Sequence, residues 1–146
     1  MSQEAERCLK VAIPFFASDD PSLSAALRRA EKLKKRSLGD LTGHLVAAST
    51  SDAPDFGEQL SQIVSARNKV VHHFDETYGA QIGADRHAEV IVALEQVLGE
   101  LKAYRSMAQQ IALHVLERLR DVTFLHTPER AEIETLCASF KAQIAR

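Results

Sequence analysis

Cysteine is scarce in this sequence, and the chain also lacks any long apolar run. Its two cysteines, Cys8 and Cys137, both stand within apolar segments of helical spacing. This scarcity argues against a disulfide framework and favours two buried thiols in a reducing compartment. No run is long enough to span a bilayer, and the N-terminus shows no apolar signal core. We therefore expect a cytoplasmic protein that does not enter a membrane.

The residue patterns that usually indicate a cofactor are missing as well. Gly39, Gly43 and Gly57 do not have the spacing of a phosphate-binding loop. Four histidines stand apart from any cysteine or carboxylate at metal-binding spacing: His44, His87, His114 and His126. We therefore expect no zinc site, no other metal and no cofactor.

The overall charge is close to neutral. The chain has 18 Lys and Arg residues against 20 Asp and Glu residues, a net charge of −2, so no global basic field indicates a nucleic-acid partner. Any RNA binding would have to use a local patch. Hydrophobic residues make up 45% and charged residues 26%, which is ordinary for a globular protein. The length predicts a single domain, residues 1–146.

Apolar residues recur at steps of three and four along the chain, and no stretch shows sustained alternation with period two. The sequence therefore predicts an all-α, up-and-down bundle of five or six helices. The longest helix is expected around residues 85–122, with an inward stripe that includes Ile91, Leu98 and Val122. Two glycines within residues 77–83 predict a turn before this helix.

Short polar signals predict where several helices begin and end. Pro14 should interrupt the first helix, because its ring clashes with the preceding turn. The Asp-Pro pair at residues 20–21 predicts the start of the second helix. Ser37 and Asp40 resemble a capping box, and Asp85 can cap the long helix.

Reactive side chains are concentrated in residues 66–74, which read Ala-Arg-Asn-Lys-Val-Val-His-His-Phe. Arg67 is followed directly by Asn68 and, five positions later, by His72. On a helix Asn68 and His72 share a face, whereas the directions of Arg67 and His72 differ by about 140°. Either the long Arg67 side chain curls back towards His72, or two copies of the helix assemble the site.

The pattern formed by Arg67, Asn68 and His72 resembles the signature of the HEPN superfamily, the higher eukaryote and prokaryote nucleotide-binding domains. The resemblance is specific in this stretch and extends elsewhere only as an all-α pattern. It implies an HEPN-like helical domain and a homodimer whose two motif helices form one composite cleft. It also implies a metal-independent endoribonuclease in a defence, toxin or stress role.

These residue types suit RNA cleavage by attack of the ribose 2′-OH on the adjacent phosphorus. His72 can take or give a proton near neutral pH, and Arg67 can stabilise the charge that develops on the phosphoryl oxygens. Asn68 can bind the phosphate or orient the imidazole. His73 is an auxiliary candidate and the weaker one, because it diverges from His72 by about 100° on a helix.

Cationic residues crowd the segment 28–36, and this basic run has two interpretations. The simpler and preferred one is a solvated helix face. The functional one is a phosphate track for RNA, formed by Lys34, Lys35 and Arg36 and joined by Lys69.

The motif itself also has a second interpretation, because an Arg followed by a His occurs by chance in many helices. The rival function is a catalytically inactive helical module that binds a partner protein or a nucleotide.

An antitoxin or regulatory protein is the partner that the resemblance implies. HEPN toxins paired with a minimal nucleotidyltransferase carry a modified tyrosine two residues after the motif histidine. Phe74 stands at that position and Tyr78 four residues later, so the chain does not fit that pairing cleanly.

Overall fold

The computed structural model describes residues 2–16, 20, 22–48 and 54–145. In this part of the chain the first elements are α1 (Ser2–Ala12), the 3-10 turn η1 (Ile13–Phe15), α2 (Leu23–Leu33) and α3 (Leu38–Ala48). They are followed by α4 (Pro54–His72), α5 (Phe74–Gly83), α6 (His87–Arg118), the π-helical turn η2 (Leu119–Thr123) and α7 (Arg130–Ile144). The described residues form no strand, so the prediction of an all-α fold is confirmed. The predicted number of five or six helices is wrong, because the described residues form seven α-helices.

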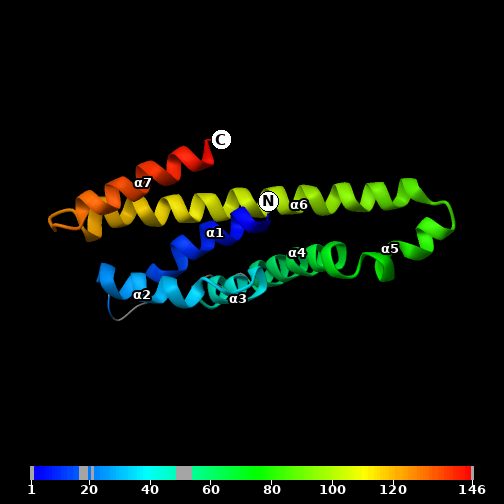
Figure 1. The fold of residues 1–146 in the computed structure, drawn as a ribbon, viewed down its shortest axis with the longest axis horizontal. Helices are drawn as coiled ribbons and strands as arrows, with labels where there is room; N and C mark the ends of the chain where they lie inside the picture. Colours follow the sequence, from blue (N-terminus) through cyan, green and yellow to red (C-terminus); the bar gives the residue numbers. More distant parts are fainter. Residues whose placement is uncertain (1, 17–19, 21, 49–53, 146) are drawn as a thin grey trace.

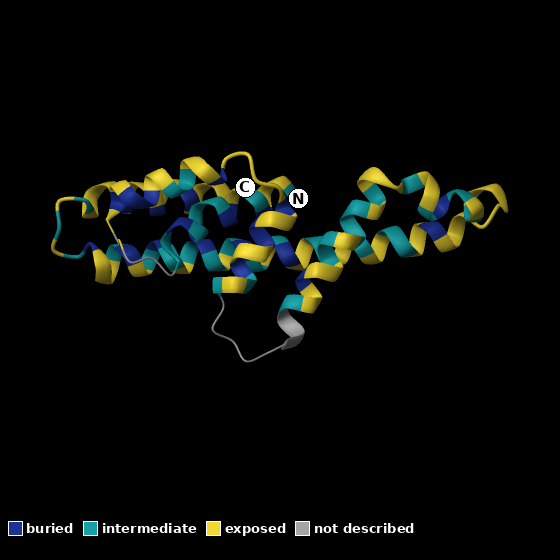
Figure 2. Ribbon diagram, turned by 90° about the horizontal axis from the view of Figure 1, so that it is seen from below, coloured by how far each residue is buried: buried dark blue, intermediate teal, exposed yellow. Residues whose placement is uncertain are grey.

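α6 is the central helix of the fold and contacts α1, α4, α5 and α7. Its C-terminal half packs against α1 and α7, and its N-terminal half runs alongside α4 and α5 (Figure 1). α3 packs against α1 and α4, whereas α2 packs against α1 and η1. The result is a thick body and a narrow arm, which consists of α5, the end of α4 and the start of α6. Figure 2 shows that buried residues are concentrated in the body, whereas the arm is mostly half-buried or exposed.

The core of the body joins α6 to α1, α3 and α7. The largest fully buried side chains in it include Leu9, Leu41, Tyr104, Leu116 and Ile133. One buried polar pair links α3 to α6: the Tyr104 hydroxyl lies 2.7 Å from Thr42 Oγ1, which donates to the Leu38 carbonyl at 2.7 Å. Because a buried hydroxyl needs such a partner, this pair fixes the position of α3 against α6.

Two of the predicted helix boundaries are confirmed. The backbone N–H of Ser37 donates to Asp40 Oδ2 at 3.2 Å, and the backbone N–H of Asp40 donates to Ser37 Oγ at 3.3 Å. These reciprocal bonds are the capping box expected at the start of α3. Pro14 lies in η1 directly after α1, so it interrupts the first helix as predicted.

Two of the predicted helix starts are wrong. Asp20 does not cap α2, because Ser22 is the N-cap and accepts from the backbone of the first turn, while Asp20 Oδ1 accepts from the Ser22 N–H at 2.9 Å. Pro21 lies outside the described residues. Asp85 does not cap α6 either. It has a φ of 59° in the turn before the helix, whereas an N-cap residue is extended, and Arg86 occupies the cap position.

The turn predicted at residues 77–83 is also wrong, because these residues belong to α5. The chain leaves helical geometry earlier, at His73, whose φ is −131° and ψ is 33°. Asp75 and Glu76 then stand in the first turn of α5, where carboxylates interact favourably with the positive end of the helix dipole. Gly79 is tolerated inside the helix at a cost of about 1 kcal/mol relative to alanine. The segment predicted as one helix and a turn is therefore two helices.

The long helix predicted around residues 85–122 is confirmed, since α6 and η2 together cover 87–123. Its inward stripe is partly wrong: Ile91, Leu98 and Val122 are 55%, 39% and 56% exposed. The two halves of α6 pack against different helices, so no single apolar face serves its whole length. Even α6, the longest described helix, is too polar to cross a membrane, and no other described helix is suited to it.

Candidate functional site

The motif lies at the C-terminal end of α4, where the body meets the arm. Arg67 and Asn68 are half-buried, and His72, the last residue of the helix, is exposed. Lys69 and His72 stand in the last turn, and the ammonium of Lys69 interacts favourably with the negative end of the helix dipole. The motif therefore occupies an open helix end and not the core.

Arg67 brings the three motif side chains together within a single chain. Its Nη1 donates to Asn68 Oδ1 at 2.9 Å and lies 3.2 Å from His72 Nε2. Of the two arrangements expected from the sequence, this is the one in which the Arg67 side chain curls back. Because arginine can only donate, Nε2 is the acceptor, and a neutral His72 ring then carries its proton on Nδ1.

The guanidinium of Arg67 keeps further hydrogen-bonding capacity. Both of its bonds to motif side chains use Nη1. Its Nε is buried and has no hydrogen-bond partner among the described residues, an arrangement that costs about 1–3 kcal/mol. The remaining N–H groups have the planar fork geometry that suits a phosphate or a carboxylate.

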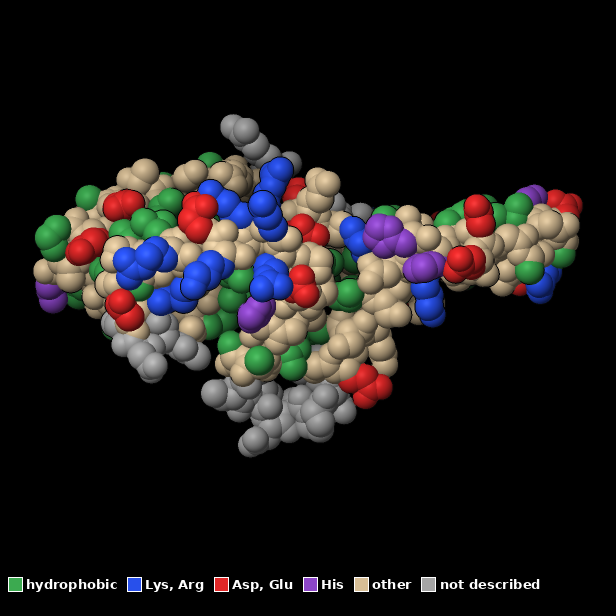
Figure 3. Space-filling view, turned by 60° about the horizontal axis from the view of Figure 1, so that its bottom comes forward, with side chains coloured by type: hydrophobic (Ala, Val, Ile, Leu, Met, Phe, Trp, Pro, Cys, Tyr) green, Lys and Arg blue, Asp and Glu red, His purple; other side chains and the backbone are tan. Residues whose placement is uncertain are grey.

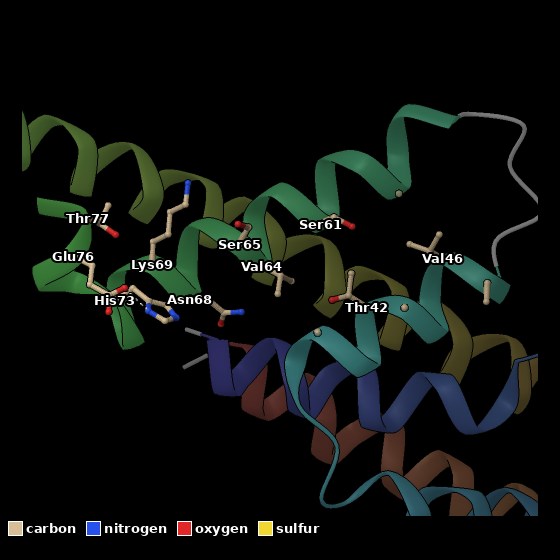
Figure 4. A pocket seen from close by; sticks show the side chains of 14 residues that line it. Thr42, Val46, Ser61, Val64, Ser65, Asn68, Lys69, His73, Glu76 and Thr77 are labelled. Atoms are coloured by element: carbon tan, nitrogen blue, oxygen red, sulfur yellow. Dashed lines mark hydrogen bonds and ion pairs between the residues drawn. The ribbon is translucent and has the colours of Figure 1, made fainter.

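His73 has a partner that sequence reasoning missed. Its Nδ1 lies 3.0 Å from Glu76 Oε2, in the first turn of α5 (Figure 4). The signal that was available is a carboxylate three residues after a histidine, at the start of a new helix. A carboxylate at Nδ1 orients an imidazole and favours the proton on that nitrogen. The Glu76 carboxylate therefore sets the orientation of the auxiliary candidate His73, whereas Arg67 sets that of His72.

A groove of about 900 Å³ runs between α3 and α4 and reaches α5 (Figure 4). Small side chains make up much of its wall: Gly39, Gly43, Ala47, Gly57, Ser61 and Ser65. Gly57 favours the close approach of the two helices, because a Cβ there would lie 3.1 Å from Val46 Cγ1 and would press on that side chain. Asn68, Lys69 and His73 line its motif end, so the groove meets the motif through Asn68.

The four residues predicted to bind RNA fall into two places. Lys69 is exposed and lines the groove. Lys34, Lys35 and Arg36 are exposed in the connection between α2 and α3, where the Lys34 ammonium pairs with Glu31 at 2.5 Å. Figure 3 shows cationic side chains gathered on one face of the body, with histidines at the start of the arm on the same face.

Other reactive side chains of the described residues do not form a second centre. No three or more His, Cys, Asp and Glu residues in this part of the chain are grouped so that they could hold a metal ion. Cys8 and Cys137 are buried free thiols, as predicted. Burial raises the pKa of Cys8 to about 11 and also raises the pKa of Cys137. Both thiols are therefore protonated and poorly nucleophilic at neutral pH.

The motif joins a proton acceptor to an anion-binding fork. His72 can accept a proton at Nε2 once Arg67 turns to an incoming anion, and Arg67 can bind a phosphate through two parallel N–H groups. Together these groups suit a reaction in which a proton leaves while negative charge builds on a phosphoryl group.

Comparisons of the chain with protein-family models, with curated proteins and with solved structures give no significant match.

Proposed function

We propose that the protein is a metal-independent endoribonuclease of the HEPN type that acts as a homodimer on RNA. One observation carries the proposal: Arg67 Nη1 lies 3.2 Å from His72 Nε2 and also holds Asn68. The three residues match the HEPN pattern in type and spacing. They lie at an open helix end beside a groove, and RNA cleavage by 2′-OH attack needs no more than a proton acceptor, a phosphate ligand and a proton donor.

In the proposed reaction the scissile phosphate draws Arg67 away from His72. The freed Nε2 of His72 takes the proton of the ribose 2′-OH as the 2′ oxygen attacks phosphorus. Arg67 stabilises the charge on the phosphoryl oxygens, and Asn68 holds the phosphate or the imidazole. The bond from phosphorus to the 5′ oxygen breaks, which leaves a 2′,3′-cyclic phosphate and a 5′-hydroxyl.

A second copy of the chain completes the proposed site. The leaving 5′ oxygen needs a proton, and His72 of the second copy can supply it. Exposed apolar side chains of the arm support pairing between copies: Val71, Ile82, Ile91, Val92 and Leu98. A two-fold axis through the arms would bury this apolar surface and bring the two α4 ends together.

A defence, toxin or stress role remains part of the proposal, with an antitoxin or regulatory protein as partner. Neutralisation by modification of a tyrosine near the motif has little support. Phe74 stands at the expected position, and Tyr78 packs against it with ring centroids 5.2 Å apart. Tyr78 is only 9% exposed, so a modifying enzyme would not reach it without a change in α5. A partner that covers the motif or the arm fits better.

A catalytically inactive interaction module is the second candidate. The observation that favours it is the closed pairing of Arg67 with Asn68 and His72, in which the three side chains are bonded to one another without any substrate. The exposed apolar arm would then serve partner binding alone. In that case neither Arg67 nor His72 is required for any reaction.

The first prediction separates these two functions. A mixed-sequence single-stranded RNA is incubated with purified protein in excess EDTA, and cleavage is followed by gel electrophoresis. We expect the wild type to cleave and His72→Ala to lose about 10²–10⁴-fold in rate, as removal of a positioned acid–base group does. Because His72 is exposed, the variant should lose roughly 0.5 kcal/mol of stability or less.

His87→Ala is the matched control, because His87 is an exposed histidine at the start of α6. It should cleave RNA at the wild-type rate. Undiminished cleavage by His72→Ala would remove the proposed mechanism. An absence of cleavage by a folded wild-type dimer would favour the interaction module.

A further inference from the structure

A concave basic surface lies on the body between η1, α2 and α3, and the proposed mechanism does not use it. It has a volume of about 440 Å³, and its basic side chains are Arg29, Lys32, Arg36 and His44. Its floor is apolar and includes Pro14, Phe16 and Leu33. We call this surface the basic cup. In Figure 3 apolar side chains are visible between cationic ones and a histidine on this face of the body.

The cations of the cup are only partly neutralised. Arg29 is held by backbone oxygens, since its Nε donates to the Pro14 carbonyl at 2.6 Å and its Nη2 to the Asp20 carbonyl at 3.1 Å. Lys32 and Arg36 form no salt bridge within the described part of the chain. Arg29, Lys32 and Arg36 stand three and four residues apart, so their like charges repel one another. An anion in the cup relieves this repulsion.

Two carboxylates lie near the edge of the cup. Asp20 is close enough to interact with Arg29, and Asp40 with Arg36 and His44. The Asp40 carboxylate is already engaged, because Oδ2 accepts from both the backbone N–H and the hydroxyl of Ser37. The cup therefore keeps an excess of positive charge beside an apolar floor.

A ligand that matches both features carries a phosphate and a flat apolar group. We propose that the basic cup binds one nucleotide of a single-stranded RNA substrate, with its phosphate on Lys32 and Arg36 and its base against Phe16. Phosphate suits the cationic wall, and base stacking on an aromatic ring suits the floor. This inference rests on the proposed function, because it makes the cup a second contact for the RNA that is cut at Arg67 and His72.

α3 supplies a route from the basic cup to the groove. Ala47 lines both, while the adjacent residues Gly43 and His44 line the groove and the cup respectively. Gly43 is exposed, and nothing lies within 4 Å of a Cβ built on it. A strand that crosses α3 at Gly43 would therefore meet no side chain from that position. From this point the groove leads to Asn68 and Lys69 at the motif.

The second prediction tests the basic cup by binding alone. Fluorescence anisotropy is measured with a labelled single-stranded RNA of about 12 nucleotides, in the His72→Ala background so that the RNA stays intact. The double variant Lys32→Glu, Arg36→Glu should bind at least about tenfold more weakly and lower the slope of log affinity against log salt by about 1–2. Lys102→Glu is the control, because Lys102 is exposed and lines neither the cup nor the groove.

Phe16→Leu tests the floor without a change in charge. It should weaken binding by about fivefold or more through loss of stacking, while circular dichroism stays unchanged. Unchanged RNA affinity in both the charge and the Phe16 variants overturns the proposal. So does a polyglutamate peptide that competes as well as RNA, because the cup would then select charge alone.

The same data keep this inference apart from the proposed nuclease. Cleavage that needs His72, together with wild-type RNA affinity in the double variant, overturns the basic cup and leaves the nuclease standing. RNA binding that depends on Lys32 and Arg36, together with a wild type that cuts no RNA, supports the cup as an RNA contact and counts against the nuclease.

Discussion

Arg67 is the residue on which the geometry of the motif depends. One of its nitrogens holds Asn68 and approaches His72, so the three side chains act as a unit. In this state the Nε2 atom of His72 accepts from Arg67. A phosphate that binds Arg67 in its place would leave Nε2 free. Under the proposed function, the free protein would hold its proton acceptor paired with Arg67, and the RNA phosphate would free it. An arginine suits this exchange because its fork can turn from a ring nitrogen to phosphoryl oxygens.

The third prediction concerns the buried thiol of Cys8, whose pKa burial raises from 9.0 to about 11. The unfolded chain releases this proton more easily than the folded protein does. The contribution of this thiol to the free energy of unfolding is therefore complete below pH 9 and is lost as the pH rises towards about 11. The loss from this group approaches about 1.4 kcal/mol per pH unit in that interval. Urea unfolding under reducing conditions at a series of pH values measures it.

Cys8→Ala is the matched variant for this test, and its free energy of unfolding should fall less steeply across the same interval. A remaining slope is expected in both proteins, because burial also raises the pKa of Tyr104. Equal slopes for wild type and Cys8→Ala would show that the thiol does not titrate as its burial requires.

At the scale of the helices, local signals in the sequence predicted most of the fold. The capping pair Ser37 and Asp40 marks the start of α3 by bonds within one turn, so sequence alone locates it. The length of α6 follows from a long run of helical spacing. α5 was missed because two glycines and a short apolar pattern resemble a turn, whereas packing against α4 and α6 keeps the segment helical.

The candidate site, too, could be predicted from the sequence only in part. The motif residues and their shared helix could be read from sequence, and so could the option that Arg67 curls back. The spacing of three residues between His73 and Glu76 was visible in the sequence, but the pairing was missed because it also depends on the helix break at His73. The groove and the basic cup were missed for a similar reason. Both are made by residues of helices that meet only in the fold, such as Gly43 with Ser65 and Phe16 with His44.

The whole molecule is asymmetric, with its core in the body and its motif at the start of the arm. The arm exposes apolar side chains that a single copy leaves in water, Val92 at 64% and Val71 at 54% among them. In the proposed dimer these side chains would be covered by the second copy. Pairing of two arms would also place two copies of the motif together, which is what the proposed reaction needs.

The fourth prediction tests this pairing. Val71→Asp should convert a dimer into a monomer and stop RNA cleavage at the same time, because a buried unpaired carboxylate in the interface is costly. Light scattering at micromolar concentration measures the mass, alongside the RNA assay. Leu136→Asp is the control, since Leu136 is a similarly exposed apolar residue on α7 in the body and should leave both unchanged. A monomeric wild type that cleaves RNA normally would defeat the composite site.

The central claim is that the protein cuts RNA through the ribose 2′-OH, with Arg67 and His72 as the reacting groups. One substrate pair tests it most directly: an RNA with a mapped cleavage position, and the same RNA with a single 2′-deoxyribose there, both in excess EDTA. We predict cleavage of the first to a 2′,3′-cyclic phosphate and no cleavage of the second at that bond. His72→Ala should cleave the first about 10²–10⁴-fold more slowly than the wild type. Cleavage of the deoxy-substituted RNA at an undiminished rate would contradict the account.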